Sequence, residues 1–362
     1  MKKRFYTVII MLCLLMIALV GCKKEEPEEA KEEVAKVVEK VKESEPVEVI
    51  PANQNLLTGI ADLSEGAIGK RPVAVMVNNV NDALPQYGIA KSDVIFEMHV
   101  EGDLTRLIAL YGDYTQVPKV CAVRSCRYYF PAITEGFDAF YAYWGMDDTR
   151  KNYVESLDLT DFDGMTDGNG LFGRDQARLN SGYALEHTAY FDGTKLAEVV
   201  ERNGLRSDLK ESKKGTAFIF NGLEEQVKPQ GNECTKVDVN FGKALATFTY
   251  DANTNTYLKQ INGQNQMDGV EGTQLAFTNV FVLETDVSVR TDSVSGHKQI
   301  NWQGGTGYNG YYISNGAVQK ITWSKASESD YLKFFDESGE ELSINRGKSY
   351  IAFNYPNQTI FE

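Results

Sequence analysis

Several common catalytic and metal-binding motifs are missing from this sequence of 362 residues. It contains no Cys-x-x-Cys pair, no His-Glu-x-x-His and no Gly-x-Ser-x-Gly, and it has only three histidines. These gaps remove the usual signatures of a zinc centre, a zinc protease and a serine hydrolase of the α/β type. We therefore expect neither a resident metal nor a cofactor, and the sequence designates no catalytic residue.

The sequence is also poor in cysteines that could pair. Two of its five cysteines, Cys13 and Cys22, fall in the first 22 residues, which leaves Cys121, Cys126 and Cys234. An odd number without regular spacing does not indicate a disulfide framework. Small buried thiols are the main interpretation, and a Cys121–Cys126 bridge is the alternative.

Long apolar runs are absent apart from residues 5–20, which are too few to span a bilayer comfortably. A basic start precedes this run, and it ends in Leu19, Val20, Gly21 and Cys22, the pattern of a bacterial lipobox. We predict a lipoprotein signal peptide over residues 1–22, with a diacylglycerol and its palmitate-type chains on Cys22. The chain would then face the extracytoplasmic side of the cell membrane. An uncleaved anchor helix is the alternative.

Basic residues are too few to balance the acidic ones, and the formal net charge is −14. Residues 23–50 carry ten Glu and six Lys, and most of the negative charge lies beyond them. Such a body repels nucleic acids at long range, so we expect no nucleic-acid partner. Residues 23–60 are interpreted as a charged flexible tether.

Strand and helix signals alternate over residues 61–208. β-rich runs occupy residues 72–77, 93–100, 105–111, 120–123 and 139–144, and helices are expected after Ser125, over 148–157 and over 192–203. This mixture predicts an N-terminal mixed α/β domain. The polar stretch 203–215 is the expected boundary.

Short β runs separated by turn signals fill residues 216–362. The runs cover residues 217–220, 246–250, 275–283, 310–313, 318–323 and 350–353, and turns are expected at Asn262-Gly263, Asn309-Gly310, Asn315-Gly316 and Ser338-Gly339. They predict a mostly-β C-terminal domain, so the fold class is α+β.

Three arginines and a serine form the main candidate site. Arg106, Arg124, Ser125 and Arg127 could bind an anionic ligand, because guanidinium groups fit carboxylate and phosphate in a bidentate manner. The competing interpretation is structural: Glu97, Glu101 and Asp93 would pair with these arginines and hold strands together. Both remain open.

Three other groups carry weaker signals. His187 follows Glu186 and could act as a base. The loop from Asp161 to Gly170 resembles a calcium loop, but its glycine spacing favours ordinary turns. The aromatic residues Trp302, Tyr308, Tyr311, Tyr312 and Trp323 could stack on sugars or pack a β core.

Four motifs occur in the order found in one known family. Residues 71–79, 85–88, 97–106 and 123–130 read RPVAVMVNN, PQYG, EMHVEGDLTR and VRSCRYYF. The chain thereby resembles the YerB-like lipoprotein family over residues 71–187, and more loosely over 279–353. The resemblance implies an extracytoplasmic lipoprotein with separate N- and C-terminal domains, and it implies no reaction. Cys121 and Cys126 stand where the family has Gly and Ala, so the resemblance implies no required thiol at either position.

The leading functional hypothesis is a binding or assembly module at the interface between membrane and cell wall. Its partners would be the membrane, through the lipid anchor, and a wall polymer or a membrane protein. The alternatives are a hydrolase of wall glycan or peptide and an accessory lipoprotein subunit of a membrane complex. The sequence leans away from an enzyme without excluding one.

Overall fold

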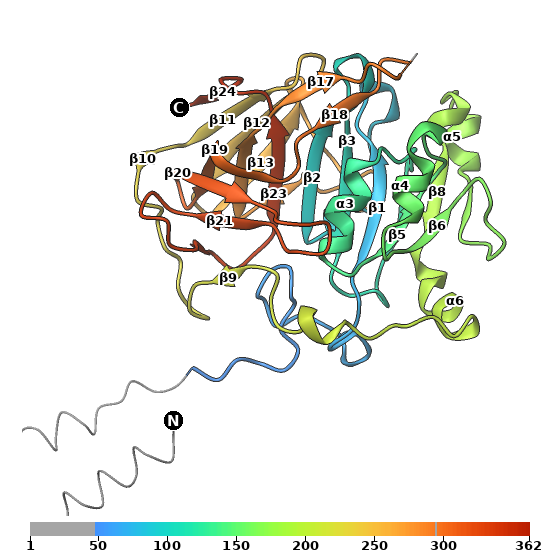
Figure 1. The fold of residues 1–362 in the computed structure, drawn as a ribbon, viewed down its shortest axis with the longest axis horizontal. Helices are drawn as coiled ribbons and strands as arrows, with labels where there is room; N and C mark the ends of the chain where they lie inside the picture. The colour runs from blue at the N-terminus through green and yellow to red at the C-terminus, as the bar shows by residue number, and fades with distance from the viewer. Residues whose placement is uncertain (1–47, 294) are drawn as a thin grey trace, which may run out of the picture. The chain divides into compact units, whose positions relative to one another are not determined.

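A large mixed sheet passes through the whole body of the protein (Figure 1). The computed structural model describes residues 48–293 and 295–362, so Cys22 and most of the predicted tether lie outside the described residues. The 11 strands follow the spatial order β10 (Asn232–Glu233), β20 (Ala317–Ser324), β19 (Gly304–Ser314), β16 (Asn279–Glu284), β23 (Ser349–Asn354), β2 (Val94–His99), β3 (Thr105–Tyr111), β1 (Val73–Asn78), β5 (Phe140–Tyr143) and β6 (Thr160–Asp163), with β21 (Lys333–Phe335) paired to β20.

Apolar side chains on both faces explain why the central strands are continuous hydrophobic runs. In β1, Val73, Val75 and Val77 join the core on one face, and Ala74 and Met76 join the core on the other. All six residues of β1 are buried. Such strands need a layer on each side of the sheet.

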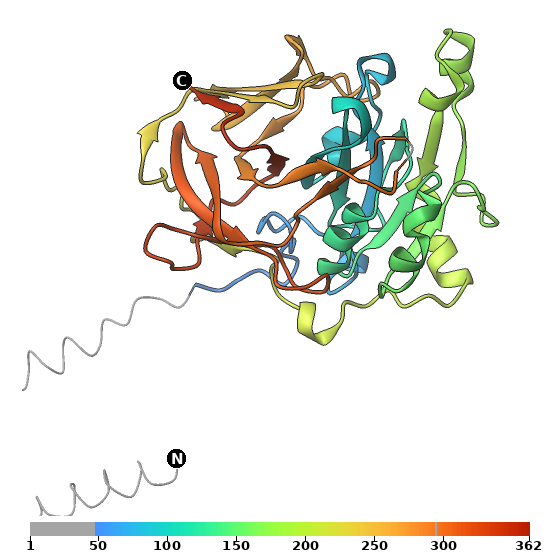
Figure 2. The same cartoon turned by 45° about the horizontal axis from the view of Figure 1, so that its top comes forward.

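A second sheet of six strands covers one of these faces, and its yellow strands lie at the top of Figure 2. Val237 and Phe248 of this sheet pack in the same core as Val75 and Ile95. Its strands are β14 (Gln264–Asn265), β13 (Thr256–Ile261), β12 (Leu245–Asp251), β11 (Lys236–Asn240) and β24 (Thr359–Phe361), with β15 (Ala276–Phe277) paired to β13.

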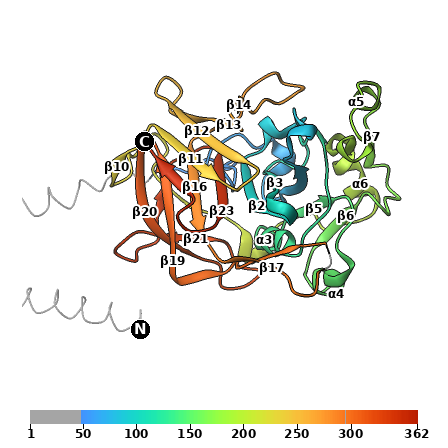
Figure 3. The ribbon, with the colours of Figure 1, turned by 90° about the horizontal axis from the view of Figure 1, so that it is seen from above.

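Helix α3 (Tyr129–Gly136) packs on the opposite face, where Phe130 and Ile133 share a core with Phe96. A separate three-stranded sheet is formed by β4 (Lys119–Cys121), β8 (Ala189–Asp192) and β7 (Phe172–Arg174), and its strand β4 lies against β1. Figure 3 shows β7, α5 and α6 at the end of the molecule away from β20. The remaining elements are α4 (Lys151–Glu155), α5 (Gln176–Asn180), α6 (Leu196–Arg202) and the strand pairs β17 (Val287–Val289) with β18 (Lys298–Ile300) and β22 (Ser343–Ile344) with β9 (Ile219–Phe220).

The α+β class is confirmed, with mixed elements before residue 208 and strands after 216. These two regions share one sheet, because β23 lies between β16 and β2 and runs parallel to both. Residues from Ile50 to Glu362 form one compact unit. The predicted bounds, 61–208 and 216–362, remain a prediction. No helix in the described ranges is long and apolar enough to cross a membrane.

Candidate functional site: an arginine cluster at a sheet edge

The predicted arginine site lies where parallel strands end. Strands β1, β5 and β6 run in the same direction, so their carboxyl ends meet at one edge of the sheet. In open α/β sheets this edge is the usual place for ligands. The segment between β4 and α3 crosses it: Arg124 N donates to Met76 O at 3.1 Å, and Trp144 N donates to Arg124 O at 3.1 Å.

Arg106 and Arg127 share one carboxylate at this edge. Arg106 Nη2 donates to Glu101 Oε1 at 2.9 Å, and Arg127 donates to both oxygens of Glu101, at 3.0 and 2.6 Å. Arg106 Nη1 also donates to Ser125 O at 2.6 Å. Burial raises the pKa of Glu101, but the charges of Arg106 and Arg127 outweigh it and lower the pKa to about 2. This geometry favours the structural interpretation for these two arginines.

Glu97 lies in a different environment from Glu101. It is fully buried in β2, where it accepts hydrogen bonds from Asn79 at 2.7 Å, from Thr105 at 2.5 Å and from Tyr350. Burial raises its pKa, and the charge of Lys259 opposes that rise. Glu97 therefore serves a buried polar network and does not pair with the three arginines.

Arg124 differs from the other two arginines. Among the residues that the structure describes, its side chain has no carboxylate or hydrogen-bond partner, and its Nε is buried without one. Its charge lowers the pKa of Arg174, where burial is the larger cause. It also lowers the pKa of His187. Burial lowers that pKa more strongly, and the charge of Glu186 opposes both effects. Within residues 48–293 and 295–362, Arg124 therefore lies near other cations and has no carboxylate that pairs with it.

Arg174 adds a second cation that the sequence did not suggest. Its guanidinium lies 4.2 Å from the centre of the Trp144 ring, and its Nη1 donates to Leu185 O at 2.6 Å. Trp144 directly follows β5. Stacking on an indole holds a guanidinium flat while its other N–H groups stay free for a ligand. No spacing in the sequence links residue 174 to residue 124.

His187 is a buried side chain held by an amide. It is 6% exposed, and its Nδ1 lies 3.0 Å from Asn78 Nδ2, which donates to it. Its Nε2 is 3.9 Å from Glu186 Oε1, beyond hydrogen-bond range. Burial lowers the pKa of His187. The neighbouring carboxylate therefore does not orient this imidazole, which weakens the hydrolase alternative.

The carboxylates of the 161–170 loop bind the chain itself. Asp163 Oδ1 accepts from Gly145 N at 2.6 Å and from Met165 N at 2.9 Å. Asp167 accepts from Asn169 N at 2.8 Å and from Phe172 N at 2.9 Å. Asp161 accepts from the Tyr143 hydroxyl at 2.6 Å. The bonds from Met165 N to Asp163 and from Asn169 N to Asp167 are of the Asx-turn type that the glycine spacing favoured.

The cysteines and the aromatic group follow the simpler interpretations. Cys121, Cys126 and Cys234 are free and buried, so no Cys121–Cys126 bridge is present. Burial raises the pKa of Cys126 to about 12. Among the aromatic residues, Trp302, Tyr312 and Trp323 are buried core residues. Tyr308 and Tyr311 are partly buried against the two cores.

Two models of one family match the chain. The N-terminal domain described as "Protein of unknown function (DUF3048)" matches residues 57–206, and the C-terminal domain of the same family matches residues 237–351. The chain belongs to this two-domain family.

The YerB protein of Bacillus subtilis is similar to this chain both in sequence and in structure. A protein of strain 168 named "Putative lipoprotein YerB" is 26% identical over 332 residues, covering 90% of this chain and 88% of that protein. The crystal structure of the YerB protein from Bacillus subtilis is similar with a TM-score of 0.70 and 24% identity, covering 85% of this chain and 98% of that chain. The resemblance read from the four motifs is confirmed.

Proposed function

We propose that this protein is a lipid-anchored, extracytoplasmic binding module whose ligand is an anion of the cell envelope, held at Arg124. The observation that carries the proposal is the unpaired guanidinium of Arg124 at the carboxyl edge of β1, β5 and β6. A buried nitrogen of a charged group without a partner is costly unless a ligand or water satisfies it.

The chemistry of the surroundings supports an anionic ligand. Glu101 is already shared by Arg106 and Arg127, so it cannot neutralise Arg124 as well. Arg174 stacks on Trp144 and supplies a second guanidinium group, whose pKa the charge of Arg124 lowers. A carboxylate or phosphate would satisfy both cations with charge-assisted hydrogen bonds. Wall peptides and wall polymers carry such groups, which fits a role between membrane and wall.

The test compares three variants for stability and for ligand binding. Arg124→Ala should keep the melting temperature of the wild type or raise it, because it removes repulsion among like charges. It should weaken binding of a carboxylate-bearing muropeptide or of a glycerol-phosphate wall fragment by about 1.5–3 kcal/mol, the worth of a charge-assisted hydrogen bond. The two fragments distinguish a carboxylate from a phosphate ligand.

Two control variants separate binding from architecture. Arg127→Ala should lower stability by about 1–3 kcal/mol, because Glu101 would lose its bidentate partner. Arg202→Ala removes an exposed arginine that pairs with Glu198 on α6, and it should change neither property. The proposal is wrong if Arg124→Ala unfolds the protein as Arg127→Ala does and no fragment shifts the melting of the wild type.

The anchor is a separate part of the proposal. Cys22 lies outside the described residues, so support comes from the lipobox at residues 19–22 and from the lipoprotein name of the relative. Cys22→Ala should abolish lipid attachment and leave the signal uncleaved. Mass spectrometry of the membrane fraction measures both effects. Recovery of a diacylglycerol adduct on the variant would refute this part alone.

A further inference from the structure

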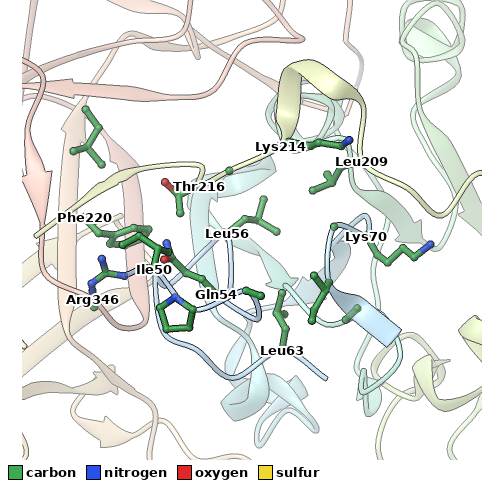
Figure 4. Close-up of a pocket in the computed structure, with 17 residues that line it drawn as sticks. Ile50, Gln54, Leu56, Leu63, Lys70, Leu209, Lys214, Thr216, Phe220 and Arg346 are labelled. Atoms are coloured by element: carbon green, nitrogen blue, oxygen red, sulfur yellow. The ribbon is translucent and has the colours of Figure 1, made fainter. Parts of the chain in front are cut away.

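An apolar cavity lies at the start of the compact body, where Ile50 and Pro51 form part of its wall. It has a volume of about 630 Å³, within the range of small-molecule sites. Figure 4 shows Leu56 and Leu63 between Phe220 with Arg346 on one side and Lys70 on the other. The lining comes from three stretches, residues 50–70, 209–220 and Arg346.

The first two stretches are bound to each other, so the cavity is a built feature of the body. Ala217 N donates to Leu56 O at 2.8 Å. Leu56 and Leu63 are buried, whereas Ile50, Ile68 and Ile219 are 50%, 39% and 44% exposed. Exposed isoleucines gathered around an apolar hollow are unusual for a free surface and typical of one that receives an apolar group.

The charged side chains that line the cavity are all cationic, although the chain as a whole is acidic. Of the described residues that line it, three are cationic, namely Lys70, Lys214 and Arg346. No acidic residue is among the described lining residues. The whole chain carries −14. Lys70 and Lys214 pair with the exposed Asp208 and Glu211, both at 2.7 Å. Such surface pairs are weak enough to exchange for another anion.

Arg346 is the one of these three cations that pairs with no carboxylate of the described residues. Its Nε donates to Asn221 O at 2.9 Å, and its Nη1 donates to Gly59 O. Its guanidinium lies 5.7 Å from the centre of the Phe220 ring. Within residues 48–293 and 295–362, it forms no ion pair with a carboxylate. The carbonyl contacts fix the guanidinium beside the apolar lining while its positive charge remains unbalanced.

The position of the cavity also relates it to the membrane. Residues 23–49 separate Cys22 from Ile50, and even when fully extended these 27 residues reach only about 90 Å. Ile50 and Pro51 themselves line the cavity. If Cys22 is lipidated, as proposed above, the cavity is tied within this reach of the bilayer surface.

We propose that this cavity binds one anionic phospholipid of the membrane, with an acyl chain against Leu56, Leu63 and Phe220 and the phosphate beside Arg346. This lipid site is distinct from the Arg124 site and goes beyond the proposed function. It gives the protein a second membrane contact besides the covalent anchor.

The test uses the unlipidated chain from residue 23 to 362, which keeps the whole described body. The probe is lysophosphatidylglycerol below its micelle concentration, and binding is measured by calorimetry. Lysophosphatidylcholine, without net charge, and glycerol 3-phosphate, without an acyl chain, are the comparison ligands. We expect saturable one-to-one binding of the first, and binding at least about tenfold weaker for the other two, because each lacks the apolar or the ionic part.

Two variants with matched controls locate the binding site. Ile219→Asp places a charge in the cavity mouth, and Ile360→Asp alters an exposed isoleucine of β24. Lys214→Glu reverses one cavity cation, and Lys333→Glu reverses a similarly exposed lysine paired with Glu341. The cavity variants should lose affinity about tenfold or more, and the controls should keep it.

Several results would overturn the lipid site. They are no binding by a folded wild type, equal loss in the cavity variants and their controls, or equally tight binding of glycerol 3-phosphate. Tight binding only after removal of residues 23–47 would mean that this segment occupies the cavity instead. Because no wall fragment is present in this assay, its outcome leaves the Arg124 proposal to its own test.

Discussion

Asp93 shows how one buried carboxyl can govern the pH dependence of stability. It lies just before β2, is 9% exposed, and its Oδ2 accepts from Gly112 N at 2.7 Å. Burial raises the pKa of Asp93 to about 6, although the Gly112 amide and Asn55 oppose the rise. The folded protein therefore keeps a proton on this group at pH values where the unfolded chain has lost it.

The sign of the effect follows from that difference. The contribution of Asp93 to folding is complete below its ordinary pKa of about 4 and is lost as the pH rises through about 6. Asp93→Asn has no proton to lose, and its amide oxygen can still accept from Gly112. The free energy of unfolding of the variant, relative to the wild type, should therefore increase by about 2 kcal/mol between pH 4 and 7. Urea unfolding of both proteins across this range measures the increase, and a constant difference would contradict the raised pKa.

The side-chain pairing of the three arginines could be predicted from the sequence only in part. Arg106, Arg124 and Arg127 lie at one sheet edge, and the anion site that the sequence suggested for them stays a prediction. Sequence distance could not tell which of them Glu101 would bind. Arg124 and Arg127 are only three residues apart, yet Arg127 pairs with Glu101 and the buried Nε of Arg124 has no partner. Glu97 and Glu101 looked equivalent, yet Glu97 is in a strand interior and Glu101 in the turn after it. Side-chain pairing depends on which face of a strand a residue occupies, and that is fixed only by the assembled sheet.

At the scale of single elements, hydrophobic patterning was a good guide to strands. The run 105–111 coincides with β3, and the runs 72–77 and 93–100 differ from β1 and β2 by one residue at their ends. These strands are buried on both faces, so their apolar runs are unbroken. Helix bounds were less accurate: the expected helix 192–203 is α6 only from Leu196 to Arg202, preceded by a short 3-10 turn.

One predicted turn is wrong, and its glycine has another purpose. Asn262-Gly263 and Asn315-Gly316 have positive φ at both residues, as the hairpin turn requires. Asn309-Gly310 lies inside β19 instead, where Gly310 pairs with Ile321. A Cβ at Gly310 would lie 3.2 Å from side chains of Ile321 and Leu283. Gly310 allows the neighbouring strands to approach closely. An Asn-Gly dipeptide in the sequence therefore does not distinguish a hairpin turn from a close contact between strands.

At the scale of the whole molecule, the order of strands could not be foreseen. β23, almost at the end of the chain, inserts beside β2, and the pair Glu97–Ala352 joins positions 255 residues apart. Parallel neighbours carry no local turn signal, so only the complete core selects them. The sequence therefore indicated two regions, and the structure gives them a common sheet and a common core.

Buried polar groups reinforce this connection between the two regions. Glu97 of β2 accepts a hydrogen bond from Tyr350 of β23. Gln266 donates to Asn79 at 3.2 Å, and Lys259 donates to Gln266 at 2.6 Å. Burial lowers the pKa of Lys259 to about 8, against the opposing charge of Glu97. Separating the regions would leave such groups without partners, which is costly in a core of low polarity.

These contacts predict that the two regions cannot fold alone. The fragments 48–208 and 216–362, which leave out residues 209–215 between them, test this. Fragment 48–208 would expose the edge of β2, which invites aggregation, and would leave Glu97 without Tyr350. We expect each fragment alone to lack a cooperative unfolding transition, and the two expressed together to form a complex with one. Near-ultraviolet circular dichroism during thermal melts measures this. A cooperative melt of fragment 48–208 by itself would instead support two independent domains with the bounds that the sequence suggested. The pairing of β23 with β2 would then be a contact between two domains that fold separately.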